Sequence, residues 1–152
     1  MPIHFYCEDI RFVLKDKTII RTWICDTCFS FGKEPGRINY IFCSNPKILE
    51  INKSYLKHNY YTDIISFDYS DEKKVAGDIY ISIDTVYLNS IQFETSFYDE
   101  LHRVLIHGVL HFLGKKDKSI EQIKEMRFEE NLALHKLKQL CSTWNKKEKN
   151  NK

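Results

Sequence analysis

The chain has 152 residues, enough for one domain with a hydrophobic core of its own. Its 23 basic and 21 acidic residues leave a net charge of +2, which excludes a strongly basic protein that wraps nucleic acid but allows a local basic groove. Five cysteines are an odd number for a disulfide framework. The N-terminal residues MPIHFYCEDIRF lack a secretory leader, and charges interrupt every apolar run, so we expect a soluble, cytoplasmic protein without a membrane partner.

The first half of the chain alternates predicted strands and helices. Alternating apolar residues predict a half-buried strand over residues 3–7, and apolar residues at helical spacing predict a helix over about 16–31. A buried strand is expected over residues 38–43. Pro46 can then begin a helix, because proline fits the first helical turn. A further strand is expected over residues 63–67.

The second half contains one strand and three predicted helices. The polar segment 71–74 indicates a turn, and residues 77–83 alternate as a strand, after which a short helix is expected from Asp84. The segment Ser96–Asp99 is typical of a capping box that begins a helix. This helix extends to Leu113 and is apolar nearly all round in its second half, which predicts a buried central helix.

A second capping box, Ser119–Gln122, begins a last helix that is expected to end near Trp144. Glu130 falls on the apolar stripe of this helix, so it either lies at the solvent-exposed edge of the helix or pairs with a cation. The order of elements predicts an α+β fold with a small mixed sheet of about four strands and about five helices. We expect one domain over residues 1–145 and a disordered basic tail over 146–152.

The most informative stretch is His107-Gly-Val-Leu-His111-Phe-Leu-Gly114-Lys-Lys-Asp117. Histidines at i and i+4 share one face of a helix and can bind one divalent cation. Gly114 can adopt the left-handed conformation that ends a helix, which would bring Asp117 to the same ion as a third ligand. Three ligands on zinc leave one coordination position open for water, so the pattern predicts a catalytic site for one divalent metal ion per chain. The same ligand set also suits ferrous iron.

The residue directly after the first histidine narrows the set of reactions that the site could catalyse. Helical metalloproteases carry their glutamate general base directly after the first histidine, and Gly108 occupies that position here. Peptide hydrolysis is therefore disfavoured. Hydrolysis of a phosphodiester fits better, because a metal can offset charge on the phosphoryl oxygens and deliver water. The base stays open among a metal-bound hydroxide, Asp78, Asp63 and a phosphate oxygen of the substrate.

Cys25 and Cys28 form a lone CxxC motif, which invites a zinc or redox interpretation. The motif lies inside a predicted helix, and Cys28 belongs to its apolar stripe. No second CxxC completes a tetrahedral site. We therefore expect ordinary cysteines in or near the core.

The histidine motif resembles the signature of the YbeY family of metal-dependent, single-strand-specific endoribonucleases, H-G-x-L-H-L-x-G-[YH]-D-H, over residues 107–117. Upstream, Thr62–Phe67 resembles the family's P-T-D-V-L-S-F segment, and Gly77–Ser82 resembles its G-D-I-x-I-S strand. Ile51–Tyr55 is similar to its L-N-x-x-Y. The resemblance covers about residues 36–135.

This resemblance implies an α+β fold with a metal cleft, zinc as the metal, and His107 and His111 as ligands. It implies cleavage of single-stranded RNA in maturation of the 3′ end of small-subunit ribosomal RNA and in ribosome quality control. The implied partners are ribosomal RNA and the small subunit, and the oligomeric state stays open.

Two positions depart from the family's pattern. The family's third histidine aligns with Asp117, and the arginine after the tyrosine is Leu56 here. We expect Lys57 or His58 to take over the arginine's contact with RNA phosphate.

Two lysines beside the predicted ligands, Lys115 and Lys116, are further candidate RNA contacts. Two functions remain as alternatives to the nuclease. One is a non-catalytic ribosome-assembly factor with a structural metal, and the other is a metalloenzyme with two histidines and one carboxylate, such as a ferrous oxygenase.

Overall fold

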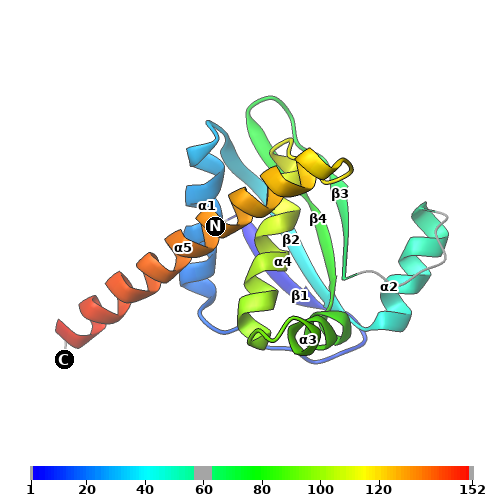
Figure 1. The fold of residues 1–152 in the computed structure, drawn as a ribbon, viewed down its shortest axis with the longest axis horizontal. Coiled ribbons are helices and arrows are strands. Elements are labelled where there is room, and N and C mark those ends of the chain that lie inside the picture. The colour runs from blue at the N-terminus through cyan, green and yellow to red at the C-terminus, as the bar shows by residue number, and fades with distance from the viewer. Residues whose placement is uncertain (1, 57–62, 151–152) are drawn as a thin grey trace.

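Four strands form a single mixed sheet in a computed structural model that describes residues 2–56 and 63–150 (Figure 1). Their order across the sheet is β1-β2-β4-β3. β1, β2 and β4 run parallel, and β3 runs antiparallel to β4. Their bounds are β1 Ile3–Cys7, β2 Glu34–Cys43, β3 Ile64–Asp68 and β4 Lys74–Ser82. Lys57 and His58, two predicted RNA contacts, lie outside the described residues.

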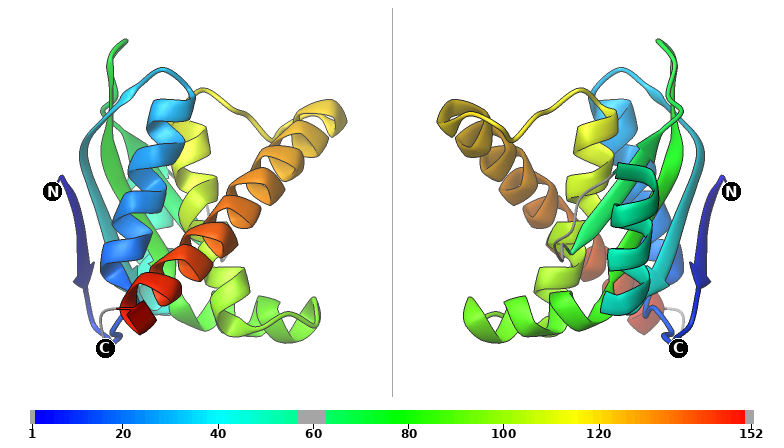
Figure 2. Two further views of the ribbon diagram at one scale, coloured as in Figure 1. Left: turned by 90° about the vertical axis from the view of Figure 1, so that its left-hand side faces the viewer. Right: turned by 90° about the vertical axis from the view of Figure 1, so that its right-hand side faces the viewer.

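Three of the helices build two layers on one face of this sheet, and α2 packs on the other face. α1 and α4 cover the sheet, and α5 crosses over both of them on the outer side (Figures 1 and 2). This arrangement confirms the predicted α+β class. The bounds are α1 Lys17–Ser30, α2 Asn45–Ile51, α3 Ile83–Gln92, α4 Phe97–Phe112 and α5 Ile120–Asn150, with a short π-helical segment, Asn52–Leu56, after α2.

Both predicted capping boxes are present. The side chain of Ser96 accepts a hydrogen bond from the backbone N–H of Asp99 at 3.0 Å. Ser119 and Gln122 cap reciprocally, each side chain accepting from the other's backbone N–H at 3.1 Å. α5 continues to Asn150, past the predicted end near Trp144 and through part of the segment predicted to be a tail. The domain boundary at residue 145 stays a prediction.

Two buried hydrogen bonds connect the layers. The indole N–H of Trp23 on α1 donates to the carbonyl oxygen of Ala133 on α5 at 2.7 Å. The hydroxyl of Tyr40 on β2 donates to the carbonyl oxygen of Leu105 on α4 at 2.8 Å. Because a buried donor without a partner costs free energy, these bonds favour one placement of α4 on the sheet and of α5 on α1.

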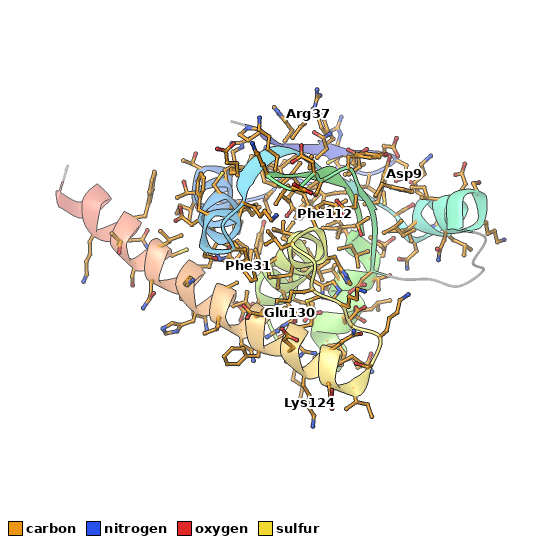
Figure 3. The ribbon with its side chains drawn as sticks, turned by 90° about the horizontal axis from the view of Figure 1, so that it is seen from above. Asp9, Phe31, Arg37, Phe112, Lys124 and Glu130 are labelled. Carbon is orange, nitrogen blue, oxygen red and sulfur yellow. The ribbon has the colours of Figure 1, made fainter. Side chains whose placement is uncertain are left out.

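Close packing at two glycines determines which face of α4 meets the sheet. A Cβ atom on Gly77 would lie 2.5 Å from the ring of Phe112, and one on Gly108 would lie 2.9 Å from Cδ1 of Ile79. Phe112 and Glu130 therefore mark opposite sides of α4, the sheet side and the α5 side (Figure 3). With residue 108 against the sheet, His107 points toward α5.

The five cysteines, all within the described ranges, are free thiols. Cys28 is fully buried in the core, and burial raises the pKa of its thiol to about 12. Cys25 is partly buried, and burial raises the pKa of its thiol too. These positions agree with core cysteines. Among the described helices, none combines the length and the apolar sequence that crossing a membrane requires.

Candidate metal centre

The three predicted ligands come together at the C-terminal end of α4. Nε2 of His107 lies 3.0 Å from Nε2 of His111, and Oδ2 of Asp117 lies 3.3 Å from each of these nitrogens. Four ligands about 2.05 Å from a tetrahedral zinc ion stand about 3.3 Å from one another. The three atoms thus have the spacing of one face of such a tetrahedron, and the cluster could hold one metal ion.

The turn after α4 brings Asp117 to the histidines. Gly114 has a φ of +95°, the left-handed conformation expected of it. Its N–H donates to the carbonyl oxygen of His111, and the N–H of Lys115 donates to that of Leu110, each at 3.0 Å. These bonds satisfy the last carbonyl groups of the helix, so the chain reverses within one turn and Asp117 faces the cluster.

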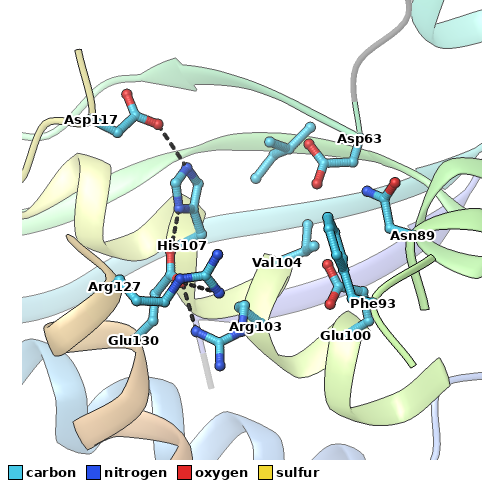
Figure 4. Close-up of a pocket in the computed structure, with 11 residues that line it drawn as sticks. Asp63, Asn89, Phe93, Glu100, Arg103, Val104, His107, Asp117, Arg127 and Glu130 are labelled. Carbon is cyan, nitrogen blue, oxygen red and sulfur yellow. Dashed lines mark hydrogen bonds and ion pairs between the residues drawn. The ribbon is translucent and has the colours of Figure 1, made fainter. Parts of the chain in front are cut away.

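Glu130 on α5 fixes the orientation of His107 (Figure 4). Its Oε2 lies 2.6 Å from Nδ1 of His107, so Nδ1 carries the proton and donates it, which leaves the lone pair of Nε2 facing the other two ligands. Glu130 is 5% exposed. Of the two options that the sequence left for Glu130, the structure shows pairing with a cation.

The cation is Arg103. Its Nη1 donates to Oε1 of Glu130 at 2.8 Å, and its Nη2 donates to Oδ1 of Asn131 at 2.9 Å. Burial alone would raise the pKa of Glu130, but the hydrogen bonds from His107 and Arg103 outweigh it and lower that pKa below its ordinary value. Glu130 is therefore an ionised carboxylate, the form that best accepts the His107 proton.

His111 presents its lone pair for a different reason. Burial, followed by the neighbouring His107, lowers the pKa of His111 below its ordinary value. A neutral imidazole is the form that binds a metal. For His107, burial lowers the pKa, but the hydrogen bond and the charge of Glu130 outweigh it and raise that pKa. The site therefore combines the Nε2 atoms of two histidines with one carboxylate, and a second carboxylate orients His107.

A pocket of about 340 Å³ lies beside His107 (Figure 4). Asp63, one of the candidate bases, lines this pocket. Asp78, another candidate, is absent from its lining and accepts a hydrogen bond from Nδ2 of Asn39 at 2.9 Å. Because successive strand residues face opposite ways, Asp78 points away from the face on which Ile79 meets α4. The geometry therefore favours Asp63 over Asp78.

The two predicted lysine contacts differ in their surroundings. Lys116 lines a second hollow, which also contacts His111 and Asp117. Lys115 pairs with the carboxylate of Glu125, which raises the pKa of Lys115, and its Nζ lies 5.8 Å from the centre of the Phe31 ring. Lys116 is therefore the better placed of the two, and RNA binding by either stays a prediction.

The fold and the cluster define an α+β protein with a candidate metal centre at the end of a buried helix. The sequence model of the family described as "Endoribonuclease YbeY" matches residues 9–138, and the chain accordingly belongs to the YbeY family. This confirms the resemblance found in the motifs.

Similar proteins agree in sequence and in fold. Proteins named "Endoribonuclease YbeY" are 51% identical over 132 residues in Phocaeicola vulgatus and 46% identical over 141 residues in Parabacteroides distasonis. These matches cover 87% and 93% of this chain, and 96% and 99% of the relatives. The solution structure of TM1509 from Thermotoga maritima superposes with a TM-score of 0.64 at 23% identity, covering 95% of this chain and 93% of TM1509.

Proposed function

We propose that the chain is a zinc-dependent, single-strand-specific endoribonuclease. In this proposal it acts in the cytoplasm on ribosomal RNA, matures the 3′ end of the small-subunit RNA and takes part in ribosome quality control. Its family and its relatives, which are named endoribonucleases, support the nuclease class. The observation that carries the metal dependence is the spacing of 3.0–3.3 Å among three ligand atoms from His107, His111 and Asp117.

The residues of the site have separate tasks in RNA hydrolysis. A bound zinc ion would supply neutralisation of phosphoryl charge and a lower pKa for water. His107, His111 and Asp117 would hold it, and Glu130 keeps the Nε2 lone pair of His107 turned toward it. Asp63 lines the adjoining pocket and is the candidate group to take the proton of the attacking water.

The surroundings of the cluster favour a catalytic over a purely structural metal. Structural zinc sites are closed by four protein ligands, whereas the described residues supply three here. The side chain of Asp117 is 40% exposed, and the cluster adjoins two pockets. A substrate can therefore reach the open side. Under the alternative of an assembly factor with a structural metal, binding to ribosomal RNA would persist without cleavage.

The decisive experiment compares His111→Ala with His135→Ala, a matched change at an exposed histidine of α5. Wild-type protein and His135→Ala should each hold one zinc ion per chain and cut a defined single-stranded RNA. His111→Ala should lose both properties while its circular dichroism stays native. Undiminished cleavage by purified His111→Ala would refute the proposal, and iron in place of zinc in elemental analysis would favour the oxygenase alternative.

A further inference from the structure

Glu100 carries a buried carboxylate that the metal centre does not use. It lies on α4 two turns before His107, is 8% exposed and lines the pocket beside His107. Among the described residues, no group donates a hydrogen bond to this carboxylate or forms an ion pair with it. Burial, followed by the charge of Asp63, raises its pKa. The carboxylate oxygens open into the pocket, where a ligand that supplies donors can reach them.

Part of the wall of the same pocket is apolar and aromatic, beside the polar side chains of Asn89, Arg103 and Arg127. Ile64 and Val104 line it, and so does Phe93, a residue that is 57% exposed. In Figure 4 the carboxylate of Glu100 lies next to Phe93 and Asn89, on the opposite side of the pocket from Asp117. The pocket therefore combines flat apolar surfaces with a polar acceptor at one edge. A nucleobase has the matching form, with two apolar faces and a polar edge.

We propose that this pocket binds one unpaired guanine of the RNA strand. The two oxygens of Glu100 accept from N1–H and from the N2 amino group of the base, and Phe93 stacks on its face. Guanine is the base whose Watson–Crick edge presents two adjacent donors, whereas adenine, cytosine and uracil each place an acceptor beside a donor. The inference rests on the proposed function, since RNA must be the substrate for a base to enter here.

A hydrated cation is the other ligand that buried carboxylates attract, and the test below includes it as the alternative occupant. Hard cations are held by several oxygen ligands and by ordered water. Asp63, Asn89 and Glu100 supply oxygen atoms in this pocket. Phe93, Ile64 and Val104 add apolar surface that a base can contact and that a hydrated cation does not use. Because the pocket adjoins His107, a guanine bound in it would lie beside the cleaved phosphodiester and would set the base preference of the reaction.

The test is a titration of zinc-loaded protein with GMP, IMP and AMP, followed by nuclear magnetic resonance at the backbone amides of Phe93 and Val104. None of these nucleotides contains a phosphodiester bond, so the result does not depend on cleavage. Their phosphates are identical, and IMP differs from GMP only by the missing N2 amino group. We expect GMP to bind at least about tenfold more tightly than IMP or AMP, which is within the range of one bidentate base contact.

The variants assign the discrimination to Glu100. Glu100→Gln keeps the shape but loses one acceptor, so its affinity for GMP should fall about tenfold, to that for IMP. Glu72→Gln, at an exposed position between β3 and β4, should behave as wild type. If Glu100→Gln fails to fold, Phe93→Ala replaces it, because Phe93 is exposed and its loss should weaken binding of all three nucleotides by removing the stack.

Equal affinities for GMP, IMP and AMP would overturn the inference. So would amide shifts at Phe93 and Val104 that Mg²⁺ alone produces in wild type and not in Glu100→Gln, because they would identify a cation site. Selective GMP binding by a protein that cuts no RNA would leave the pocket assigned and refute the nuclease. Cleavage without base discrimination would refute the pocket alone.

Discussion

The role of Glu130 can be tested by Glu130→Gln, which preserves the size of the side chain. Glu130 accepts from Nδ1 of His107 at 2.6 Å and from Nη1 of Arg103 at 2.8 Å, one donor to each oxygen. A glutamine has one acceptor and one amino group, so it can satisfy one of these donors and must face the other with its own donor. The substitution therefore removes either the hydrogen bond from His107 or the hydrogen bond from Arg103 that holds residue 130 in place.

The expected loss follows from this geometry. Removing a carboxylate that orients a metal-binding histidine typically lowers metal affinity about 10–100-fold. That range corresponds to about 1.4–2.7 kcal/mol of binding free energy. We expect Glu130→Gln to fall within it, because Glu130 is 5% exposed and water cannot easily take over the hydrogen bond to His107.

The assay is competition for zinc between the protein and a chromogenic chelator, with Glu121→Gln, an exposed position on the same helix, as the matched control. Urea unfolding of the metal-free proteins separates the two roles that Glu130 could have. A residue that only supports the fold would lower the stability of the metal-free protein and leave the zinc Kd of the folded fraction unchanged. A zinc Kd within twofold of wild type for folded Glu130→Gln would refute the orienting role.

Four further changes test other parts of the structure. Asp117→Ala should lose the bound metal during dialysis, as measured by elemental analysis. Asp117→His should keep it, because histidine restores a third ligand. Loss of the metal in both variants would show that residue 117 is not a ligand. Gly77→Ala should lower the free energy of unfolding in urea by about 1–3 kcal/mol, since its Cβ would overlap the Phe112 ring, and an unchanged midpoint would contradict this packing. Cys7, the exposed thiol, should react first with Ellman's reagent. Cys28 and Cys43 should react later, because burial raises the pKa of each thiol to about 12. Early labelling of Cys28 or Cys43 would contradict their burial. Burial lowers the pKa of His102, so on acidification the unfolded chain binds this proton at a higher pH than the folded protein does. The free energy of unfolding should therefore fall as the pH drops through about 6.5, and it should fall less steeply for His102→Phe in zinc-saturated protein. An equal slope in the two proteins would exclude this contribution of His102.

Local patterns predicted most of the fold because they arise from interactions within a few residues. The capping boxes at Ser96 and Ser119 placed the starts of α4 and α5, and Gly114 placed the end of α4. The pairing order of the strands could not be derived in this way. β3 follows β2 in the chain but pairs with β4, a contact between segments that no local pattern specifies.

The ligand cluster was predictable for the same reason, since His107, His111 and Asp117 lie within eleven residues. The groups that tune the site were not. Glu130 is 23 positions from His107. Its sequence neighbours allowed either a position at the solvent-exposed edge of α5 or pairing with a cation, and only the packing of α5 on α4 decides between the two. In the sequence, Glu100 is an acidic residue in the first turn of a helix, a position that acidic residues favour because of the helix dipole. Its burial results from the tertiary packing around α4, which this local pattern does not predict.

The packing of Gly108 explains why the acids of this site come from several elements. In the helical metalloproteases the general base directly follows the first histidine. Here a Cβ at that position would already lie 2.9 Å from Ile79 and 3.2 Å from Ile64, so the sheet occupies the space that a longer side chain would need. α4 can therefore supply nitrogen ligands on its α5 side but no base next to them on its sheet side. Asp117 from the loop after α4, Glu130 from α5 and Asp63 from the residue before β3 provide the carboxylates instead. This division favours a site that is assembled only when α5 and β3 are both packed on α4, which makes metal affinity a sensitive measure of the intact fold.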